Sequence, residues 1–305
     1  RCGYGGLTAS DMLYGDIYDA TKESDWKSIV FNDGRWGYVH AADGGTAELI
    51  ASGLPVREHE QFAGKPMRDS AGNLIIDFGQ NIAGYVKATF RGLKKGQKIR
   101  LQHGEGLDLK GEFSVDNVND YVAPVPAFQE IIYFAAGEDE ERYTPLFSVF
   151  GFRYLKIEGY EGDIEEGDFI AVALYSDMEM TGSFHCSEQL LNKLVLNSIW
   201  SQKGNFLEVA TDCPTRERNA WTGDSQVYCR TAAYFMNVYP FFEKWMIDQK
   251  LEQFESGRLD ITFPSTSSVH NEKELPFAQN IQKIYALAGP SGEGTMFGDD
   301  SAGWG

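Results

Sequence analysis

The chain is poor in cysteine, histidine and positive charge. Its 305 residues include 4 cysteines and 5 histidines, with 27 lysines and arginines against 45 aspartates and glutamates, for a formal net charge of −18. Four cysteines without C-x-x-C spacing are too sparse for a disulfide framework, so we expect free thiols. A surface short of lysine and arginine disfavours contacts with a phosphate backbone, and we therefore expect no nucleic-acid partner.

Long apolar runs and several well-known catalytic motifs are also missing. No apolar stretch of the sequence reaches the roughly 18 residues of a membrane helix, so we expect no membrane partner. The chain lacks H-E-x-x-H, Walker A and G-x-G-x-x-G, which mark zinc proteases, nucleotide-binding loops and dinucleotide-binding folds. His185 beside Cys186 has no further ligands at the spacing of a metal site. We therefore predict neither a metal nor a cofactor.

The middle of the chain has the alternating pattern of β-strands. Val86, Ala88 and Phe90 alternate with polar or small residues, as expected for a strand with one buried face. The basic cluster from Lys94 to Lys98 lies between two such strands, and its glycine favours a hairpin turn over a binding role. We assign residues 59–178 to an antiparallel β-sandwich domain.

The first segment of the chain is rich in aromatic residues, glycine and aspartate. We assign residues 1–58 to the C-terminal part of a preceding β-sandwich domain. The aromatic residues of this segment, which include Tyr18, Trp26 and Trp36, are expected in its core rather than on a sugar-binding platform.

The hydrophobic period changes from strand to helix near Ser187. Apolar residues recur at helical spacing from Leu190 to Ile199, after Ser187 as the predicted cap. A second helix is predicted to open at Asp224, and a third to carry Pro240 in its first turn and to end at Gly257. The periodicity alone predicts a helical domain.

A loop between the first two predicted helices concentrates charge beside a tryptophan. Its charged and aromatic residues are Asp212, Arg216, Glu217, Arg218, Trp221 and Asp224. Carboxylates accept hydrogen bonds from sugar hydroxyls, arginines orient carboxylates, and an indole covers the apolar face of a pyranose. Glycoside hydrolysis needs one carboxyl that stays protonated near neutral pH, which neighbouring carboxylates favour. The alternative is a surface loop with exposed ion pairs of little energetic worth.

We assign Glu217 as the general acid. Asp212 and Asp224 are predicted to hold ring hydroxyls, and Arg216 to orient the group. Trp221 is predicted to pack on the sugar. The glycine-rich segment 289–305 is predicted to be a loop that lines the sugar pocket with Trp304.

The sequence of this loop, Asp-Cys-Pro-x-Arg-Glu-Arg followed by Trp-Thr-Gly-Asp, closely resembles the signature of bacterial α-L-rhamnosidases, glycoside hydrolase family 78. Further motifs of that family follow in the same order: Phe78-Gly-Gln-Asn81-x-Ala-Gly84, Phe150-Gly-Phe-Arg-Tyr154, Thr181-Gly-Ser-Phe184, Trp200-Ser-Gln202, Gly204-Asn-Phe206 and Gly303-Trp304-Gly305. The resemblance covers essentially the whole chain. One departure is Ala220, which stands where the family commonly has glycine and which would be strained if its φ had to be positive.

The resemblance implies an inverting hydrolase that removes terminal α-L-rhamnose from a glycan or glycoside, with Glu217 as its acid. It also implies that residues 179–305 form the first part of an (α/α)₆ barrel, a six-hairpin glycosidase domain. The family supplies its general base as a later glutamate, and no residue of this chain matches it. An inverting enzyme holds its acid and base roughly 6.5–9.5 Å apart, with water between base and sugar.

The chain begins Arg-Cys-Gly and stops at Gly305, so we expect truncation at both ends and an inactive fragment. Two alternatives stay open: an (α/α)-barrel glycosidase acting on a different sugar, and a non-catalytic carbohydrate-binding protein. The oligomeric state, the aglycone, calcium binding and the compartment, whether cytoplasmic, periplasmic or secreted, are not determined by the sequence.

Overall fold

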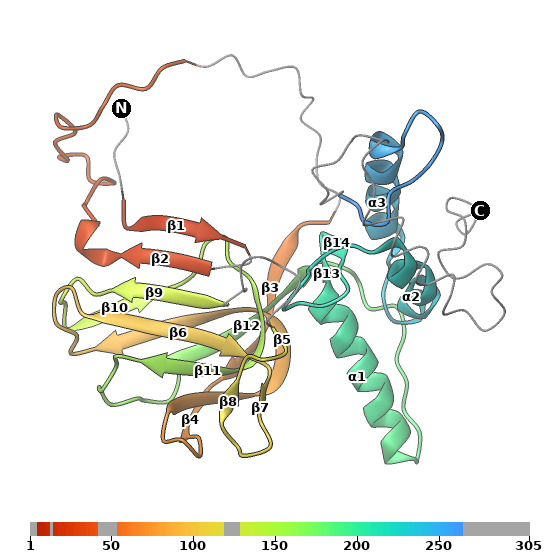
Figure 1. The fold of residues 1–305 in the computed structure, drawn as a ribbon, viewed down its shortest axis with the longest axis horizontal. Helices are drawn as coiled ribbons and strands as arrows, with labels where there is room; N and C mark the ends of the chain where they lie inside the picture. Colours follow the sequence, from red (N-terminus) through yellow and green to blue (C-terminus); the bar gives the residue numbers. More distant parts are fainter. Residues whose placement is uncertain (1–4, 13–14, 42–53, 119–128, 265–305) are drawn as a thin grey trace. The chain divides into compact units, whose positions relative to one another are not determined.

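The computed structural model describes residues 5–12, 15–41, 54–118 and 129–264, which form a region of strands followed by a region of helices (Figure 1). Two compact units divide the chain. The sheet unit comprises residues 1–52, 58–174 and 214–216, and the helical unit comprises residues 53–57, 175–213 and 217–305. The predicted succession of a β-domain and helices is therefore confirmed.

Within the described residues, the sheet unit is built on a ten-stranded sheet. Its strands are β1 (Leu7–Asp11), β2 (Gly15–Asp19), β3 (Val56–Ala63), β4 (Lys65–Arg68), β5 (Leu74–Arg91), β6 (Lys98–Gly104), β9 (Glu130–Phe134), β10 (Glu140–Tyr143), β11 (Phe150–Glu158) and β12 (Phe169–Ser176). The order across the sheet is β1-β2-β9-β6-β11-β5-β12-β3, and β4 and β10 also pair with β5. A small separate hairpin of β7 (Gly106–Leu107) and β8 (Phe113–Ser114) follows β6 in the sequence.

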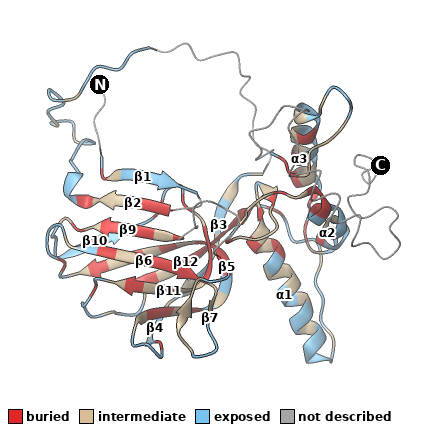
Figure 2. Ribbon diagram, viewed as in Figure 1, coloured by how far each residue is buried: buried red, intermediate tan, exposed pale blue. Residues whose placement is uncertain are grey.

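The long strand β5 pairs with four other strands and places one face in the core. Val86, Ala88 and Phe90 are almost fully buried, whereas the residues between them are half-buried. This alternation is the one predicted from the sequence, because successive side chains of a strand point to opposite faces. Figure 2 shows the same buried stripe continuing through the neighbouring strands.

The segment of positive charge between β5 and β6 is not a hairpin turn, contrary to the prediction. β11 pairs with both β5 and β6 and separates them in the sheet. The connection does turn tightly, since Gly92 and Gly96 both have positive φ. The prediction failed because the pairing of β11, more than fifty positions later in the chain, is not visible in a local pattern.

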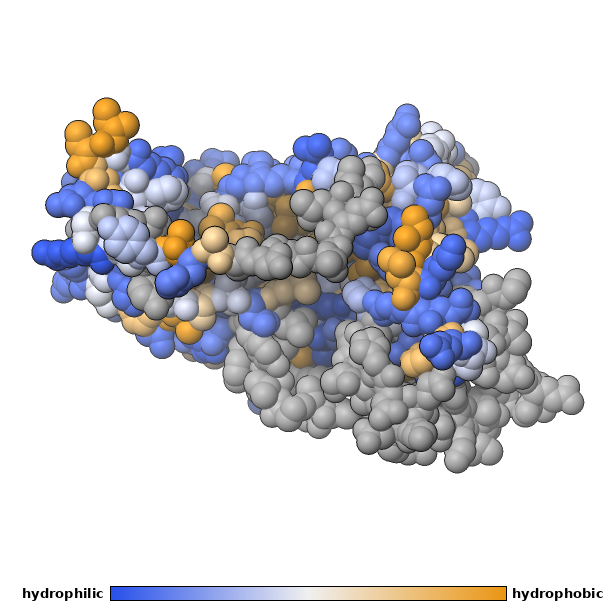
Figure 3. Space-filling view, turned by 90° about the horizontal axis from the view of Figure 1, so that it is seen from above, coloured by the Kyte–Doolittle hydropathy of each residue, from blue (hydrophilic) through white to orange (hydrophobic). Residues whose placement is uncertain are grey.

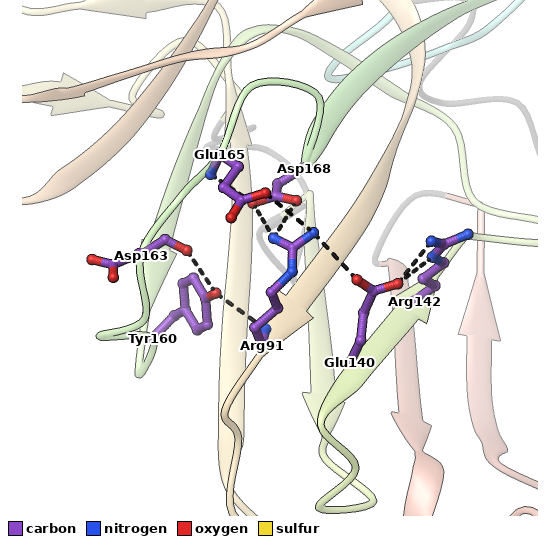
Figure 4. Close-up of polar contacts among 7 residues, drawn as sticks. All are labelled: Arg91, Glu140, Arg142, Tyr160, Asp163, Glu165 and Asp168. Atoms are coloured by element: carbon purple, nitrogen blue, oxygen red, sulfur yellow. Dashed lines mark hydrogen bonds and ion pairs between the residues drawn. The ribbon is translucent and has the colours of Figure 1, made fainter.

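The end of β5 is tied to its neighbours by an ion-pair cluster around Arg91 (Figure 4). Its guanidinium donates to both oxygens of the buried Asp168 at 2.7 Å. It also pairs with Glu140 on β10 at 3.2 Å. Asp168 accepts a further 2.7 Å bond from the backbone N–H of Glu165, so its charge is compensated on two sides.

The N-terminal strands belong to the same sheet. β2 runs parallel to β9, with Gly15 opposite Glu130 and Asp19 opposite Phe134, so the predicted antiparallel sheet is mixed at this pair. Among the aromatic residues expected in a core, Tyr18 stacks on Tyr133, but Trp26 is 53% exposed and corrects that prediction. Residues 23–41 contain no strand that could bury it. The expected domain boundaries at 58 and 178 stay predictions.

The main part of the helical unit begins at the end of β12. Its elements are α1 (Gln189–Asn205), β13 (Phe206–Leu207), β14 (Val209–Ala210), α2 (Thr222–Phe235) and α3 (Tyr239–Glu252). The three predicted helices are confirmed, with shifts at their ends. Glu188, not Ser187, caps α1 through its side chain, α2 opens at Thr222 rather than Asp224, and α3 ends before Gly257. Pro240 lies in the first turn of α3, as predicted.

The core of the helical unit gathers around stacked phenylalanines. Phe206 and Phe241 lie 4.6 Å apart between ring centroids and are nearly parallel. Met236 and Ala232 belong to the same buried cluster. The outer face of α1 is different, because Leu190 and other apolar residues of this helix are exposed.

Seen from above, the described surface is mostly hydrophilic with separate hydrophobic side chains (Figure 3). No helix in the described ranges is long and apolar enough to cross a membrane.

Candidate active site

Residues 212–224, which comprise most of the loop between β14 and α2 and the first three residues of α2, are called the acid loop here. Two hydrogen bonds join Asp212 and Asn219 across it. The N–H of Asp212 donates to the carbonyl of Asn219 at 3.0 Å, and the N–H of Asn219 donates to Asp212 Oδ1 at 3.0 Å. Arg218 has a φ of 53°, and this left-handed residue reverses the chain. Ala220 is not among the residues of positive φ, so the strain considered for it is absent.

The end of the acid loop pairs with residues 261–263 in the manner of two antiparallel strands. The N–H of Phe263 donates to the carbonyl of Ala220, and the N–H of Thr222 donates to the carbonyl of Ile261. Trp221 forms the bridge between them, opposite Thr262. Ala220 and Phe263 are buried in one cluster with Trp245. Trp221 therefore stands at the N-cap of α2 on a firmly packed base.

Glu217 is held at both its backbone and its side chain. Its N–H donates to Cys213 Sγ at 3.3 Å. Its Oε2 accepts the indole N–H of Trp221 at 3.0 Å. The two residues that were predicted to act separately, one as acid and one as a sugar platform, thus make a direct hydrogen bond. Trp221 is half-buried as a residue.

Burial and the negative charge of Glu217 raise the proton affinity of the two aspartates of the acid loop, Asp212 and Asp224. Burial raises the pKa of Asp212 to about 6, and the negative charge of Glu217 adds to the rise. A hydrogen bond from the Cys213 thiol and the N–H of Asn219 oppose it. Displacement of solvent by the surrounding protein also raises the pKa of Asp224, and the charge of Glu217 contributes in the same direction. Repulsion between like charges is a common feature of sites that move protons.

A cavity of about 470 Å³ in the helical unit has both aspartates in its wall. Its lining combines Asp212 and Thr211 of the loop region, Asp224, Ser225, Val227 and Tyr228 of α2, Ser201, Gln202 and Asn205 of α1, and Phe206 and Ala210 of the hairpin. The wall is mostly apolar, with amide, hydroxyl and carboxylate groups set into it, and this combination is typical of a pocket for a small ligand. The described residues contain no group of three or more histidines, cysteines, aspartates or glutamates that could hold a metal ion.

Several lining residues were not singled out from the sequence. Gln202 and Asn205 lie within the short motifs Trp-Ser-Gln and Gly-Asn-Phe that carried the family resemblance, and this was the signal that could have found them. Tyr228 was assigned only to the apolar face of a helix, yet its hydroxyl donates to the carbonyl of Ser198 at the cavity. Cys213 was treated as an ordinary free thiol.

Two predicted site residues take no part in the contacts of the acid loop and the cavity described above. Arg216 is exposed and groups with the sheet unit, whereas Asp212, Glu217, Trp221 and Asp224 belong to the helical unit. Trp304 lies outside the described residues, as does the rest of the predicted glycine-rich loop. The assigned roles of all these residues are not tested by the geometry and stay predictions.

Two domain families match the chain. Residues 67–175 match the bacterial α-L-rhamnosidase concanavalin-like domain, and residues 179–279 match the bacterial α-L-rhamnosidase six-hairpin glycosidase domain. The first covers most of the sheet unit, and the second begins at the helices and contains the acid loop. The predicted fold class, a β-sandwich followed by the first part of a helical barrel, is confirmed by these matches.

Curated proteins that are similar in sequence are also α-L-rhamnosidases. An α-L-rhamnosidase of Streptomyces avermitilis is 34% identical over 276 residues, which cover 89% of this chain and 26% of that protein. One from Formosa agariphila is 32% identical, with 90% and 28% covered. The chain thus spans between a quarter and a third of the length of the curated relatives it matches.

Solved structures agree. The Streptomyces avermitilis α-L-rhamnosidase complexed with L-rhamnose superposes with a TM-score of 0.80 at 33% identity, over 87% of this chain and 26% of that one. The α-L-rhamnosidase from Dictyoglumus thermophilum gives 0.79 at 31% identity, over 88% and 30%.

Proposed function

Because the chain belongs to the bacterial α-L-rhamnosidase family, we propose that it carries the proton-donating part of a glycosidase that removes terminal α-L-rhamnose. The partner in this proposal is a rhamnose-containing glycan or glycoside. Support comes from the two matched domains and from a similar protein whose structure contains L-rhamnose.

One observation carries the proposal. Three carboxylates, those of Asp212, Glu217 and Asp224, interact electrostatically at the acid loop, and two of them line the cavity of the helical unit. In a loop of exposed ion pairs, a neighbouring cation would instead lower the pKa of a carboxylate such as Asp212. Burial and the charge of Glu217 favour retention of a proton at Asp212 and Asp224, and proton donation to a leaving oxygen is what glycoside hydrolysis requires.

In the proposed mechanism Glu217 gives its proton to the glycosidic oxygen. The indole N–H of Trp221 holds Oε2 in one position, so the carboxyl keeps a constant direction toward the substrate. Asp212 and Asp224 accept hydrogen bonds from ring hydroxyls at the cavity wall. Arg216 and Trp304 keep their proposed substrate-binding roles. The reaction inverts configuration, and the resemblance assigns the base that activates water to a later glutamate.

The experiment uses the protein in its full natural length with rhamnosides of good and poor leaving groups. Glu217→Gln is expected to lower kcat by about 10²- to 10⁴-fold on substrates with poor leaving groups, the usual contribution of proton donation. Activated aryl rhamnosides need less proton transfer and should lose less. Glu255→Gln, an exposed residue outside the acid loop, is the matched control and should leave both rates unchanged.

Other outcomes point to other assignments. Equal losses on both kinds of substrate would reject Glu217 as donor and favour Asp212 or Asp224. A panel of nitrophenyl glycosides separates a rhamnosidase from a barrel enzyme with another sugar preference. Saturable rhamnose binding without turnover of any rhamnoside would favour a carbohydrate-binding protein.

A further inference from the structure

The segment that pairs with the end of the acid loop, residues 261–263, is called the clamp segment here. Its first carbonyl, that of Ile261, accepts two bonds from Thr222: one from the backbone N–H at 2.9 Å and one from the hydroxyl at 3.1 Å. A carbonyl oxygen has two lone pairs, so it can accept both donors. Thr222 is almost fully buried and directly follows Trp221 in the chain.

The hydroxyl of Thr222 is used outside its own helix. A threonine near the start of a helix commonly caps it by accepting a bond from a backbone N–H of the first turn. The N-cap of α2 is Trp221, which makes no side-chain cap bond, and the Thr222 hydroxyl donates to the clamp segment instead. The threonine of the sequence Trp-Thr-Gly-Asp therefore makes a tertiary contact beside the residue that holds the proposed acid.

The other end of the clamp segment is held by α3. The indole N–H of Trp245, a buried residue of α3, donates to the carbonyl of Phe263 at 2.9 Å. Phe263 is fully buried, and its own N–H donates to the carbonyl of Ala220 at 3.1 Å. A buried carbonyl that loses its donor is costly, so the indole keeps this end of the segment in place. The two neighbours of Trp221 in the chain are thus both bonded to a segment that α3 holds.

We propose that Thr222 and Trp245 are positioning residues for the general acid. Through the clamp segment they fix the backbone of Trp221, and the indole N–H of Trp221 in turn holds Oε2 of Glu217 at 3.0 Å. Neither Thr222 nor Trp245 touches the substrate. The inference rests on the proposed glycosidase function, in which Glu217 donates a proton to the leaving oxygen, and it extends the support of that acid from the loop itself to α3.

A purely structural role makes a different prediction. In that case the bonds of Thr222 and Trp245 would only stabilise the start of α2, and their loss would lower the Tm without altering the chemistry of the protein that stays folded. A positioning role predicts instead that proton donation suffers, while the reaction of substrates that need little proton transfer is retained.

Substitutions in the full-length protein separate these roles. Thr222→Val keeps a branched side chain but removes the hydroxyl donor, and Thr222→Ser keeps the donor. Trp245→Phe keeps an aromatic ring but removes the indole N–H that binds Phe263. Thr231→Val is the matched control, because Thr231 lies exposed on the same helix and outside the acid loop.

The first measurement compares kcat for rhamnosides with poor and with activated leaving groups. Thr222→Val should lower kcat for the poor leaving group about three- to tenfold and Trp245→Phe about tenfold, because each removes one hydrogen bond that supports the direction of the acid. Activated aryl rhamnosides should change by less than about twofold. Thr222→Ser should recover most of the loss, and Thr231→Val should leave both rates unchanged.

The second measurement needs no enzymatic activity. Protein labelled with 5-fluorotryptophan gives ¹⁹F resonances, and that of Trp221 is identified by its loss in Trp221→Phe. Because the indole N–H donates to Glu217, this resonance should shift when that carboxyl titrates, and the shift should disappear in Glu217→Gln. The shift should become smaller in Thr222→Val and in Trp245→Phe, and it should return in Thr222→Ser.

The two measurements distinguish the failure of the inference from that of the proposed function. A Trp221 resonance that loses its response to Glu217 in Thr222→Val and regains it in Thr222→Ser supports the positioning role. The same result in a protein without rhamnosidase activity still supports that role and rejects the function.

Other results overturn the inference. An unchanged response of the Trp221 resonance in Thr222→Val and Trp245→Phe overturns the positioning role, whatever the activity of the protein. Equal losses of kcat for both kinds of leaving group, without recovery in Thr222→Ser, overturn it as well, because such damage is not specific to proton donation. If Trp245→Phe fails to fold, the two Thr222 variants decide alone.

Discussion

Carboxylates in the sheet unit and in the acid loop are held in opposite ways. In the sheet unit Asp77 accepts two bonds from Arg153, which lower its pKa. Burial alone would raise the pKa of Asp69, but hydrogen bonds from Asn73, Phe113 and Ala71 lower it to about 2. In the acid loop, burial and then the negative charge of the neighbouring Glu217 raise the pKa of Asp212 to about 6.

The difference separates two uses of the same functional group. A carboxylate surrounded by donors is fixed in its ionised form and contributes to stability, because its charge is compensated in the folded state. A carboxylate beside another carboxylate can change its protonation near neutral pH, at some cost in stability. The carboxylates of the sheet unit thus act as fixed cross-links, whereas the carboxylate of Asp212 can change its protonation near neutral pH.

The first prediction removes a cross-link from the sheet unit. Asp168→Ala deletes the acceptor of two 2.7 Å bonds from Arg91 and one from the N–H of Glu165. We expect the free energy of opening of β5 and β12 to fall by about 2–3 kcal/mol, since several bonds to a buried charge are lost. Hydrogen–deuterium exchange of peptides from these strands measures it in the full-length protein.

Glu140→Ala is the control for this change, because Glu140 also pairs with Arg91 but is 39% exposed. Exposed ion pairs contribute about 0–1 kcal/mol, so little effect is expected. If both variants lost the same stability, the buried position of Asp168 would not be the reason for its contribution.

The second prediction concerns Asp69, which binds the turn after β4 to β8. Asp69→Ala should destabilise this region by about 2 kcal/mol, because the N–H groups of Asn73 and Phe113 lose their acceptor. Asp108→Ala, which removes a similar but exposed turn acceptor, should cost well under half of that. Amide exchange in residues 69–73 and 113–114 measures both.

The pH dependence of Asp69 has a definite sign. Its pKa in the folded protein, about 2, lies below the ordinary value of 3.8. Its contribution to stability is therefore fully present above pH 3.8 and is lost as the pH falls through about 2. A stability loss in this region that began near neutral pH would contradict the assignment.

The parts of the fold that could be predicted from sequence are those with a local cause. The alternation along β5 and the helical spacing from Leu190 to Ile199 are properties of neighbouring residues, and both elements form as predicted. The insertion of β11 between β5 and β6 is a non-local pairing, so the supposed hairpin before Lys98 was wrong. Consecutive strands pair often but not always.

The same distinction applies to the candidate site. The residue types and order of the acid loop sufficed to propose acid chemistry and the family. The bond between Trp221 and Glu217 was not predicted, because it depends on the left-handed conformation of Arg218 and on the bridge of Trp221 to Thr262. Nothing in the sequence marks a residue such as Arg218 for positive φ, since glycine and asparagine usually occupy such positions.

The third prediction tests whether Trp221 positions the acid or only packs on the sugar. Trp221→Phe keeps an aromatic ring but removes the indole N–H that donates to Glu217 Oε2. We expect kcat for a poor leaving group to fall about tenfold, which corresponds to one hydrogen bond of about 1.4 kcal/mol. L-rhamnose affinity should change little, because the ring remains.

Trp221→Ala removes ring and donor together and should in addition weaken L-rhamnose binding by about 1–3 kcal/mol, the usual size of a lost apolar contact. Calorimetry with rhamnose and leaving-group kinetics distinguish the two variants. Unchanged kinetics and affinity in both, with a lower Tm only, would return Trp221 to a purely structural role at the start of α2.

The last prediction sharpens the contrast within the acid loop itself. Burial and the charge of Glu217 together raise the pKa of Asp212, so Glu217→Gln should remove the second cause and leave the first. We expect the titration of Asp212 to move down from about 6 by less than one unit, a change of under about 1.4 kcal/mol. Because the folded pKa is raised, ionisation of Asp212 reduces stability as the pH rises from 3.8 through about 6, and this loss should become smaller in Glu217→Gln. Infrared difference spectra of protein with ¹³C-labelled aspartate, assigned with Asp212→Asn, follow the titration directly. A midpoint that stays in place would mean that burial alone sets the proton affinity of Asp212, and that the two carboxylates do not act as a pair.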